Sequence, residues 1–351
     1  MYESLGFDTL TAPQASVWFA LILGAAFGLL AERTRFCFRR GLVGEDRRAA
    51  LGVWLTGLAV ALLGTQGAVA LGWIDFGDHR FLASDLPVAA ILLGGALFGA
   101  GMVLTRGCVS RLTVLTASGN LRALTVLAVF AVVAHATLKG LLAPVRVALA
   151  DVTLPLGETT TLAALPGGAA LWTAALAVLA LVYAARSGNR WPMLAGGALI
   201  GLLVPLGWVG TGFVLYDDFD PIAMQSLAFT STWADTLFYT VASTAVPAGF
   251  GVGLVGGVLL GAFVSALAAR RFQWQSFTSP RETGRYLAGA ALMGVGGVLA
   301  GGCTVGAGLS GVPTLSIAAL LALAAITAGA LVTNLLLSGA SSRTAALHPA
   351  E

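Results

Sequence analysis

The sequence predicts an all-α polytopic membrane protein with about nine transmembrane helices, arranged as two repeats of inverted topology. Composition gives the class, because 58% of the 351 residues are hydrophobic and only 10% are charged, with a mean hydropathy of +0.90. A soluble domain of this composition would expose large apolar patches. The apolar stretches have the length of about 20 residues that a membrane-crossing helix needs, and they lack the alternation typical of barrel strands.

Hydropathy indicates where each of these helices lies. The residues before the first helix include Glu3 and Asp8 but no lysine or arginine. They therefore lack the basic region of a secretory signal, and we expect the first helix to be retained. The nine predicted helices are 15–31, 49–72, 86–105, 121–143, 168–185, 192–214, 237–268, 285–302 and 313–338.

Charged residues in the connections predict the orientation. Arginines follow the first, fifth and seventh helices, whereas aspartates such as Asp75, Asp217 and Asp235 occupy the opposite connections. By the positive-inside rule, the N-terminus lies outside and the C-terminus in the cytoplasm, in a cell inner membrane. The formal net charge of +3 therefore comes from arginines in the connections on the cytoplasmic side. It does not indicate nucleic acid as a partner.

A glycine-cysteine pattern, G-x-G-x5-G-C, occurs at 99–108 and again at 294–303. It closes the third and the eighth predicted helices, five crossings apart, so the two copies have opposite orientation. A G-A-x-x-G-L-L pattern relates 24–30 to 197–203 by the same offset. The predicted organisation is a first half at 1–150 with helices 1–4, a linker with helix 5 at 151–191, a second half at 192–340 with helices 6–9, and a cytoplasmic tail at 341–351.

Inverted halves with glycine-interrupted segments are typical of transporters whose site lies near the membrane midplane. The alternative is structural, since glycines four residues apart also let transmembrane helices pack closely. For any single glycine pair, this second interpretation stays open.

The segment 301–311 is rich in glycine, which weakens a helix and permits positive φ. Irregular backbone at membrane depth has to be buried in protein or line a cavity. Its N–H groups, and a helix that begins just after it, would favour an anion. Near Cys108, Thr105, Ser110 and Thr113 add hydroxyl groups; Arg106 and Arg111 add positive charge, although long arginine side chains can also reach lipid headgroups.

The chain has three cysteines, and each follows the end of a predicted helix. They could be small buried hydrophobic residues, but their shared position favours a common purpose. A disulfide, a Cys/His catalytic pair and a metal site are weaker interpretations, since there is no C-x-x-C and the histidines have no ligand-like spacing. We predict no metal or cofactor, and a thiol that donates weakly to a soft anion. The predicted substrate path consists of Cys37, Cys108, Cys303, Gly107, Gly302, Thr304, Ser110 and Arg111.

Three blocks of this sequence together resemble the YeeE/YedE family of membrane proteins. They are Arg35-Phe36-Cys37, then Gly107-Cys108-Val109-Ser110-Arg111 followed by Gly119-Asn120-Leu121-Arg122-Ala123-Leu124, and finally the glycine-rich 302–311. The family takes up thiosulfate as an inorganic sulfur source. The resemblance covers most of the chain; the long central region at 139–168 and the polar segment at 216–235 depart from the compact family pattern.

The resemblance implies nine crossings with short re-entrant helices, and an hourglass narrowed at its centre. It implies that thiosulfate passes inward by S–H to sulfur hydrogen bonds, with Cys303 on the outer side, Cys108 near the constriction and Cys37 toward the cytoplasm. It also implies delivery to a cytoplasmic sulfur-carrier or sulfurtransferase protein, so that the partners are thiosulfate, membrane lipid and this protein. The chain is predicted to be a transporter and no enzyme. The alternatives are a membrane sulfurtransferase that forms a cysteine persulfide, or a transporter of another sulfur or selenium oxyanion.

Overall fold

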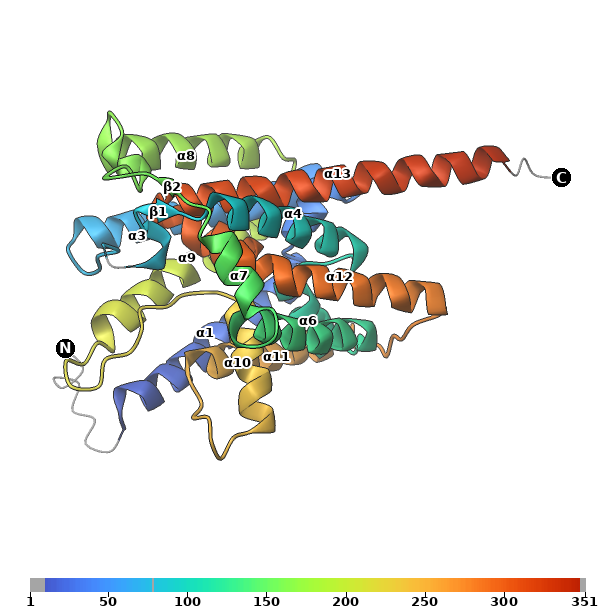
Figure 1. Ribbon diagram of the computed structural model, residues 1–351, viewed down its shortest axis with the longest axis horizontal. Helices are drawn as coiled ribbons and strands as arrows, with labels where there is room; N and C mark the ends of the chain where they lie inside the picture. The colour runs from blue at the N-terminus through green and yellow to red at the C-terminus, as the bar shows by residue number, and fades with distance from the viewer. Residues whose placement is uncertain (1–9, 78, 348–351) are drawn as a thin grey trace.

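The computed structural model describes residues 10–77 and 79–347, which form an almost entirely helical protein (Figure 1). Within this described part, nine helical segments are long and apolar enough to cross a membrane. The predicted all-α membrane fold is therefore confirmed. The helices of these nine segments are, in order, α1 (Ala12–Thr34) with α2 (Phe38–Val43), α3 (Arg47–Ala70), α4 (Val88–Leu104) with α5 (Val109–Ala117), α6 (Leu121–Lys139), α8 (Gly168–Ala185), α9 (Trp191–Val209) with the π-helix η4 (Gly210–Val214), α11 (Phe250–Ala268), α12 (Pro280–Leu299) with the π-helix η5 (Thr304–Gly311) and the 3-10 helix η6 (Val312–Thr314), and α13 (Ile317–Leu347).

The start of α1 and the end of α13 lie at opposite ends of the molecule, as expected for an odd number of crossings between them (Figure 1). Helix α13 continues into the segment predicted as a tail, whose last residues, 348–351, lie outside the described residues. The shorter elements between the spans are the 3-10 helix η2 (Arg80–Leu82), β1 (Asp85–Leu86), α7 (Ala143–Ala150), β2 (Leu154–Pro155), the 3-10 helix η3 (Leu162–Ala164) and α10 (Thr230–Val241).

The long central region contributes α7, β2 and η3. Strand β2 pairs with β1 in antiparallel register, with Asp85 opposite Pro155. The backbone around Thr161 forms a bridge to Ser316 in the second half. This region therefore connects the loop before α4 to the start of α13.

The predicted helix at 237–268 is wrong at its start. Helix α10 ends at Val241, and α11 begins only at Phe250. The intervening segment is apolar, so hydropathy extends the span through it. It contains Pro247, which lacks an N–H donor, and Gly249, which weakens a helix, so the chain leaves the helical conformation there.

The glycine-rich segment after α12 also differs from the predicted irregular backbone. Residues 304–311 form the π-helix η5, which is buried throughout. Within this segment only Gly301 has a positive φ, of 73°. Burial among neighbouring spans keeps these residues helical despite their glycine content.

Most of the patterned glycines pack helices against each other, which confirms the structural interpretation for those residues. A Cβ atom added to Gly24 or Gly28 of α1 would collide with the backbone of α11. In the same way, Gly197 and Gly201 of α9 leave room for the backbone of α3. These are the two copies of the G-A-x-x-G-L-L pattern, and both support close helix contacts.

The main helix contacts of the first half recur between the corresponding helices of the second half. In this correspondence α1, α3, α4, α5 and α6 match α9, α11, α12, η5 and α13. Helix α1 packs on α11 as α9 packs on α3, and α4 packs on α13 as α12 packs on α6. Helices α1 and α9 touch each other, as do α4 and α12. The short helix α5 contacts α1, α6 and α11, while η5 contacts the corresponding α9, α13 and α3. This packing supports the proposal of two inverted halves, at 1–150 and 192–340, with 151–191 between them.

Two neighbouring glycines of α11 test the close packing. A Cβ at Gly257 would collide with the Leu21 carbonyl of α1, whereas a Cβ at Gly256 meets nothing within 4 Å. We expect Gly257→Ala to lower the free energy of unfolding by about 1 to 3 kcal/mol, and Gly256→Ala to raise it by up to about 1 kcal/mol because alanine favours helix. Thermal unfolding of the purified variants in detergent measures both. Equal midpoints for the two variants would contradict the packing.

Candidate functional site

Each of the three cysteines stands directly before a short helix, at a break within a membrane segment. Cys37 precedes α2, Cys108 precedes α5 and Cys303 precedes η5. All three have extended backbone at the N-cap position. Serine, threonine, aspartate or asparagine is the usual residue there, because an oxygen can accept from the first free N–H groups. Cysteine at all three breaks is therefore a departure from ordinary capping.

A residue with left-handed backbone lies two positions before each cysteine. This conformation ends the preceding helix and redirects the chain toward the next one. After α1 and α4, the N–H groups of Phe36 and Gly107 bond back to the carbonyls of Ala31 and Met102. The three left-handed residues are Arg35 (φ 52°), Arg106 (φ 58°) and Gly301 (φ 73°).

Gly107 and Gly302 shape the last step before the cysteine. A Cβ at Gly302 would lie 2.7 Å from the Ala307 nitrogen, and a Cβ at Gly107 would lie 3.2 Å from the Leu112 side chain. Both glycines allow the following helix to fold back tightly against the break. The structure thus gives these two predicted site residues a role in the backbone geometry.

The three thiols are free and buried, and the structure brings them together. Cys108 is central: its thiol interacts with that of Cys37 and lies within electrostatic range of Cys303. Its Sγ lies 3.3 Å from the Ser110 Oγ. The Sγ of Cys303 accepts from the Gly306 N–H at 3.3 Å. The three side chains therefore form a succession of thiols through the protein interior.

Thr304 lies at the junction between Cys303 and Cys108. Its hydroxyl is near enough to act on the Cys108 thiol, yet Oγ1 is buried without a partner in full hydrogen-bonding geometry. A buried hydroxyl in this condition is free to donate to a passing ligand.

Arg111 faces the cysteines from the side of α5. Its guanidinium donates to the Ala31 carbonyl at 3.5 Å and acts electrostatically on Cys37 and Cys108. Arg106, by contrast, is exposed. Of the two arginines weighed for a headgroup role, only Arg111 lies along the predicted path.

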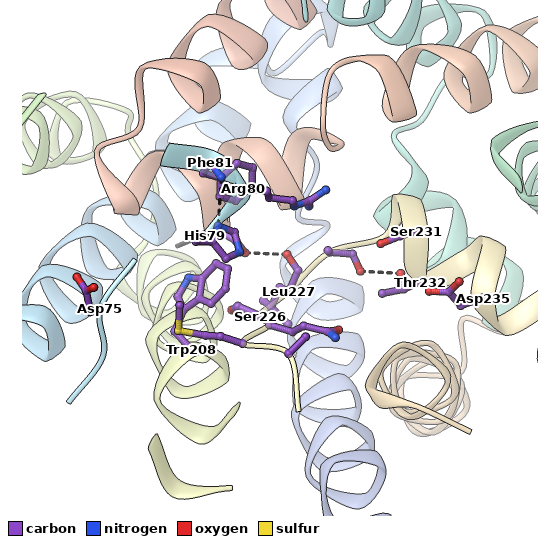
Figure 2. Close-up of a pocket in the computed structure, with 16 residues that line it drawn as sticks. Asp75, His79, Arg80, Phe81, Trp208, Ser226, Leu227, Ser231, Thr232 and Asp235 are labelled. Atoms are coloured by element: carbon purple, nitrogen blue, oxygen red, sulfur yellow. Dashed lines mark hydrogen bonds between the residues drawn. The ribbon is translucent and has the colours of Figure 1, made fainter. Parts of the chain in front are cut away.

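A cavity of about 530 Å³ opens at the end of the molecule where the 79–82 and 216–229 segments lie. Figure 2 shows His79 and Trp208 on one side of it, and Ser231, Thr232 and Asp235 on the other. Gly306 and Ser310 of η5 also line it. The cavity therefore borders the helix that Cys303 caps, at the residue whose N–H donates to the Cys303 Sγ.

Arg80 and Trp208 are functional candidates that the sequence analysis missed. Arg80 lines the cavity and acts electrostatically on Cys303. Trp208 is buried, and its indole N–H has no hydrogen-bond partner. A basic residue within an otherwise acidic connection was the signal for Arg80. Nothing in the sequence indicated a function for Trp208, because an aromatic residue in an apolar helix usually serves only to pack against other helices.

A second cavity, of about 390 Å³, lies on the other side of the cysteines. Arg111 lines it together with the buried carboxylate Glu32. The protein is thus hollowed from two sides, with the thiols buried between the hollows. The remaining residues that line the second cavity are Arg35, Leu115, Ser118, Asn120, Arg270, Arg271, Gln273 and Gln275.

The fold and these features define a polytopic membrane protein with buried thiols between two cavities that each contain arginine. A sequence profile for sulphur transport matches residues 33–332. The chain therefore belongs to the sulphur transport family, and the resemblance to YeeE/YedE proteins is confirmed.

Three relatives show how far the similarity reaches. The chain is 27% identical over 317 residues to the thiosulfate transporter TsuA of Escherichia coli strain K12, across 82% of this chain and 85% of the relative. It is 26% identical over 324 residues to the thiosulfate transporter TsuA of Spirochaeta thermophila, across 87% of this chain and 94% of the relative. A 114-residue stretch is 34% identical to the probable transporter YedE of Escherichia coli strain K12, across 30% of this chain and 26% of that protein.

His79, which lines the 530 Å³ cavity, makes the stability of the protein depend on pH. Burial and, to a lesser extent, the Arg80 charge lower the pKa of His79 from 6.5 to about 4. Its Nδ1 accepts from the Phe81 N–H at 3.3 Å, which suits a neutral ring. Between pH 6.5 and pH 4, His79 is protonated in the unfolded chain but stays neutral in the folded chain. The contribution of His79 to the free energy of unfolding is therefore fully present above pH 6.5 and is lost as the pH falls toward 4.

We expect the free energy of unfolding to fall by about 1 to 2 kcal/mol from this source between pH 7 and pH 5, after allowance for the partial exposure of the ring. The thermal midpoint of the wild type should therefore drop further than that of His79→Gln over this range. An identical drop in both proteins would show that the ring titrates normally.

Proposed function

We propose that the protein carries thiosulfate inward across a cell inner membrane, by relay of the anion between the thiols of Cys303, Cys108 and Cys37. The observation that carries this proposal is the succession of three free, buried thiols between two cavities, each of which contains arginine. Two relatives that span nearly the same length are named thiosulfate transporters.

The chemistry of the path suits the two ends of thiosulfate. The terminal sulfur is soft and polarisable and can accept from a thiol S–H, whereas the three oxygens carry charge that arginine and N–H donors stabilise. Serine would cap these short helices better than cysteine. The use of sulfur at all three breaks therefore favours contacts selected for sulfur over contacts selected for capping.

Each thiol contact is expected to be weak, on the order of 1 kcal/mol. Weak contacts in sequence allow the ion to leave one thiol for the next, which conduction through a selective site requires. The groups nearest Cys108 are the Cys37 thiol and the Ser110 and Thr304 hydroxyls. Each of these groups can itself donate a hydrogen bond to the passing anion.

The proposed direction follows the charges at the two ends. The cavity beside Arg80 is the outer entrance and the cavity beside Arg111 opens to the cytoplasm, with the N-terminus outside and the C-terminus inside. Delivery to a cytoplasmic sulfur-carrier or sulfurtransferase protein completes the proposal. The relatives are named as transporters, and these names favour a transporter over an enzyme.

Replacement of single cysteines tests the relay. Cys303→Ala, Cys108→Ala and Cys37→Ala should each lower thiosulfate uptake by about fivefold or more, since each removes a contact worth on the order of 1 kcal/mol. The measurement is uptake of ³⁵S-thiosulfate by cells that depend on this protein for it, normalised to the amount in the membrane. Thr56→Ala is the matched control, because it truncates a small buried side chain of α3 whose hydroxyl bonds only the Gly52 carbonyl.

Uptake at the level of Thr56→Ala in all three cysteine variants would rule the relay out.

Mass spectrometry of the purified protein after incubation with thiosulfate distinguishes the relay from persulfide formation. The relay predicts unmodified cysteines, whereas a membrane sulfurtransferase predicts a reducible persulfide on one of them. Competition by sulfate, sulfite and selenite shows whether another oxyanion is the preferred substrate.

A further inference from the structure

The inner cavity has an unusual balance of charge. Four of the residues that line it are arginines, and Glu32 is the one carboxylate among them. Glu32 is 6% exposed, so its charge is held inside the protein. The four arginines are Arg35, Arg111, Arg270 and Arg271.

Glu32 occupies a fixed position. Its Oε2 accepts from the Arg271 guanidinium at 2.7 Å and from the Ser265 hydroxyl at 2.8 Å. It also acts electrostatically on Arg111. A carboxylate of the protein is thus held against two of the cations that face this cavity.

Within the described part of the chain, Arg271 is the one of these four arginines that is ion-paired; the other three are not bonded to a carboxylate. Among the described residues, Arg35, Arg111 and Arg270 form no ion pair with a carboxylate. Arg111 also reaches Cys37 and Cys108 electrostatically. An anion that leaves the thiols therefore meets positive charge that the protein itself does not neutralise.

The rim of this cavity is built by a contact between the two halves. The N–H of Leu121 donates to the Gln275 carbonyl at 2.8 Å, and the Asn120 amide donates to the Gln275 side chain at 3.0 Å. Gly119, with φ 95°, permits the approach, since a Cβ there would lie 2.5 Å from the Gln273 carbonyl. The Gly119-Asn120-Leu121 motif thus fixes the segment 273–275 beside the cavity.

We infer that the inner cavity is an exit site for a divalent sulfur oxyanion, and that Glu32 is a built-in competing carboxylate that keeps its affinity low. This inference rests on the proposed function. The unpaired arginines attract the anion from the thiols, and Arg271, left free, would add to that attraction. Glu32 occupies Arg271 and opposes the anion by like charge, so that the anion leaves the protein.

Neutralisation of Glu32 tests the inference. Purified Glu32→Gln should bind thiosulfate about tenfold more tightly than wild type at fixed ionic strength, because a nearby like charge is removed. Its maximal uptake rate should fall, since release from the exit site becomes slower. Isothermal titration calorimetry with sodium thiosulfate measures the first, and uptake of ³⁵S-thiosulfate by cells measures the second.

Asp151→Asn is the control. Asp151 is an exposed carboxylate at the end of α7, and it does not line the cavity. Its neutralisation should change neither affinity nor rate. Glu32→Asp keeps the charge and should resemble wild type. Equal affinities for Glu32→Gln and Asp151→Asn would overturn the inference, as would tight binding by Glu32→Asp.

A second variant covers the case in which Glu32→Gln does not fold. Arg35 is exposed, so Arg35→Gln should preserve the fold and weaken thiosulfate binding by about fivefold. Unchanged affinity in Arg35→Gln would contradict an exit site. The proposed function fails separately, if the wild type takes up no thiosulfate; normal wild-type uptake with no effect of Glu32 or Arg35 would reject the exit site alone.

Discussion

A helix that is broken inside a membrane exposes backbone N–H and C=O groups that lipid cannot satisfy, and this constraint organises the whole protein. Three breaks occur, at Cys37, Cys108 and Cys303. Each can exist only because other spans surround it. The close glycine contacts of α1 with α11 and of α3 with α9 hold the two halves tightly enough to bury these breaks.

The same constraint places the three thiols between the two cavities. The breaks place cysteines in the interior while the connections between spans stay at the two ends, where they leave cavities. Arg80 lies in one cavity and Arg111 in the other, with the thiols between them. In the proposed function, charge attracts the anion at either cavity, whereas the thiols between them offer only weak donors. Such a division suits an ion that must enter and leave without being trapped.

Sequence patterns predicted the fold well because hydropathy responds to the membrane, which acts on every span alike. They failed at Pro247 and Gly249, where an apolar segment leaves the helical conformation. The cysteines were predictable because rarity and shared position mark them. The placement of Arg80, Trp208 and Glu32 was not predictable, since it depends on contacts between distant segments. Glu32 bonds to Ser265 of α11 and to Arg271 in the connection after it, and no local sequence pattern encodes these contacts.

The central claim is that the soft sulfur of the anion travels along the thiols. A structure of the protein with bound selenosulfate, in which selenium replaces the terminal sulfur, tests it most directly through the anomalous signal of selenium. A relay along the thiols predicts non-covalent selenium in contact with the Cys303 and Cys108 thiols, with the oxygens directed toward arginine or N–H donors. Selenium confined to sites away from all three cysteines, or covalently attached to one of them, would contradict it.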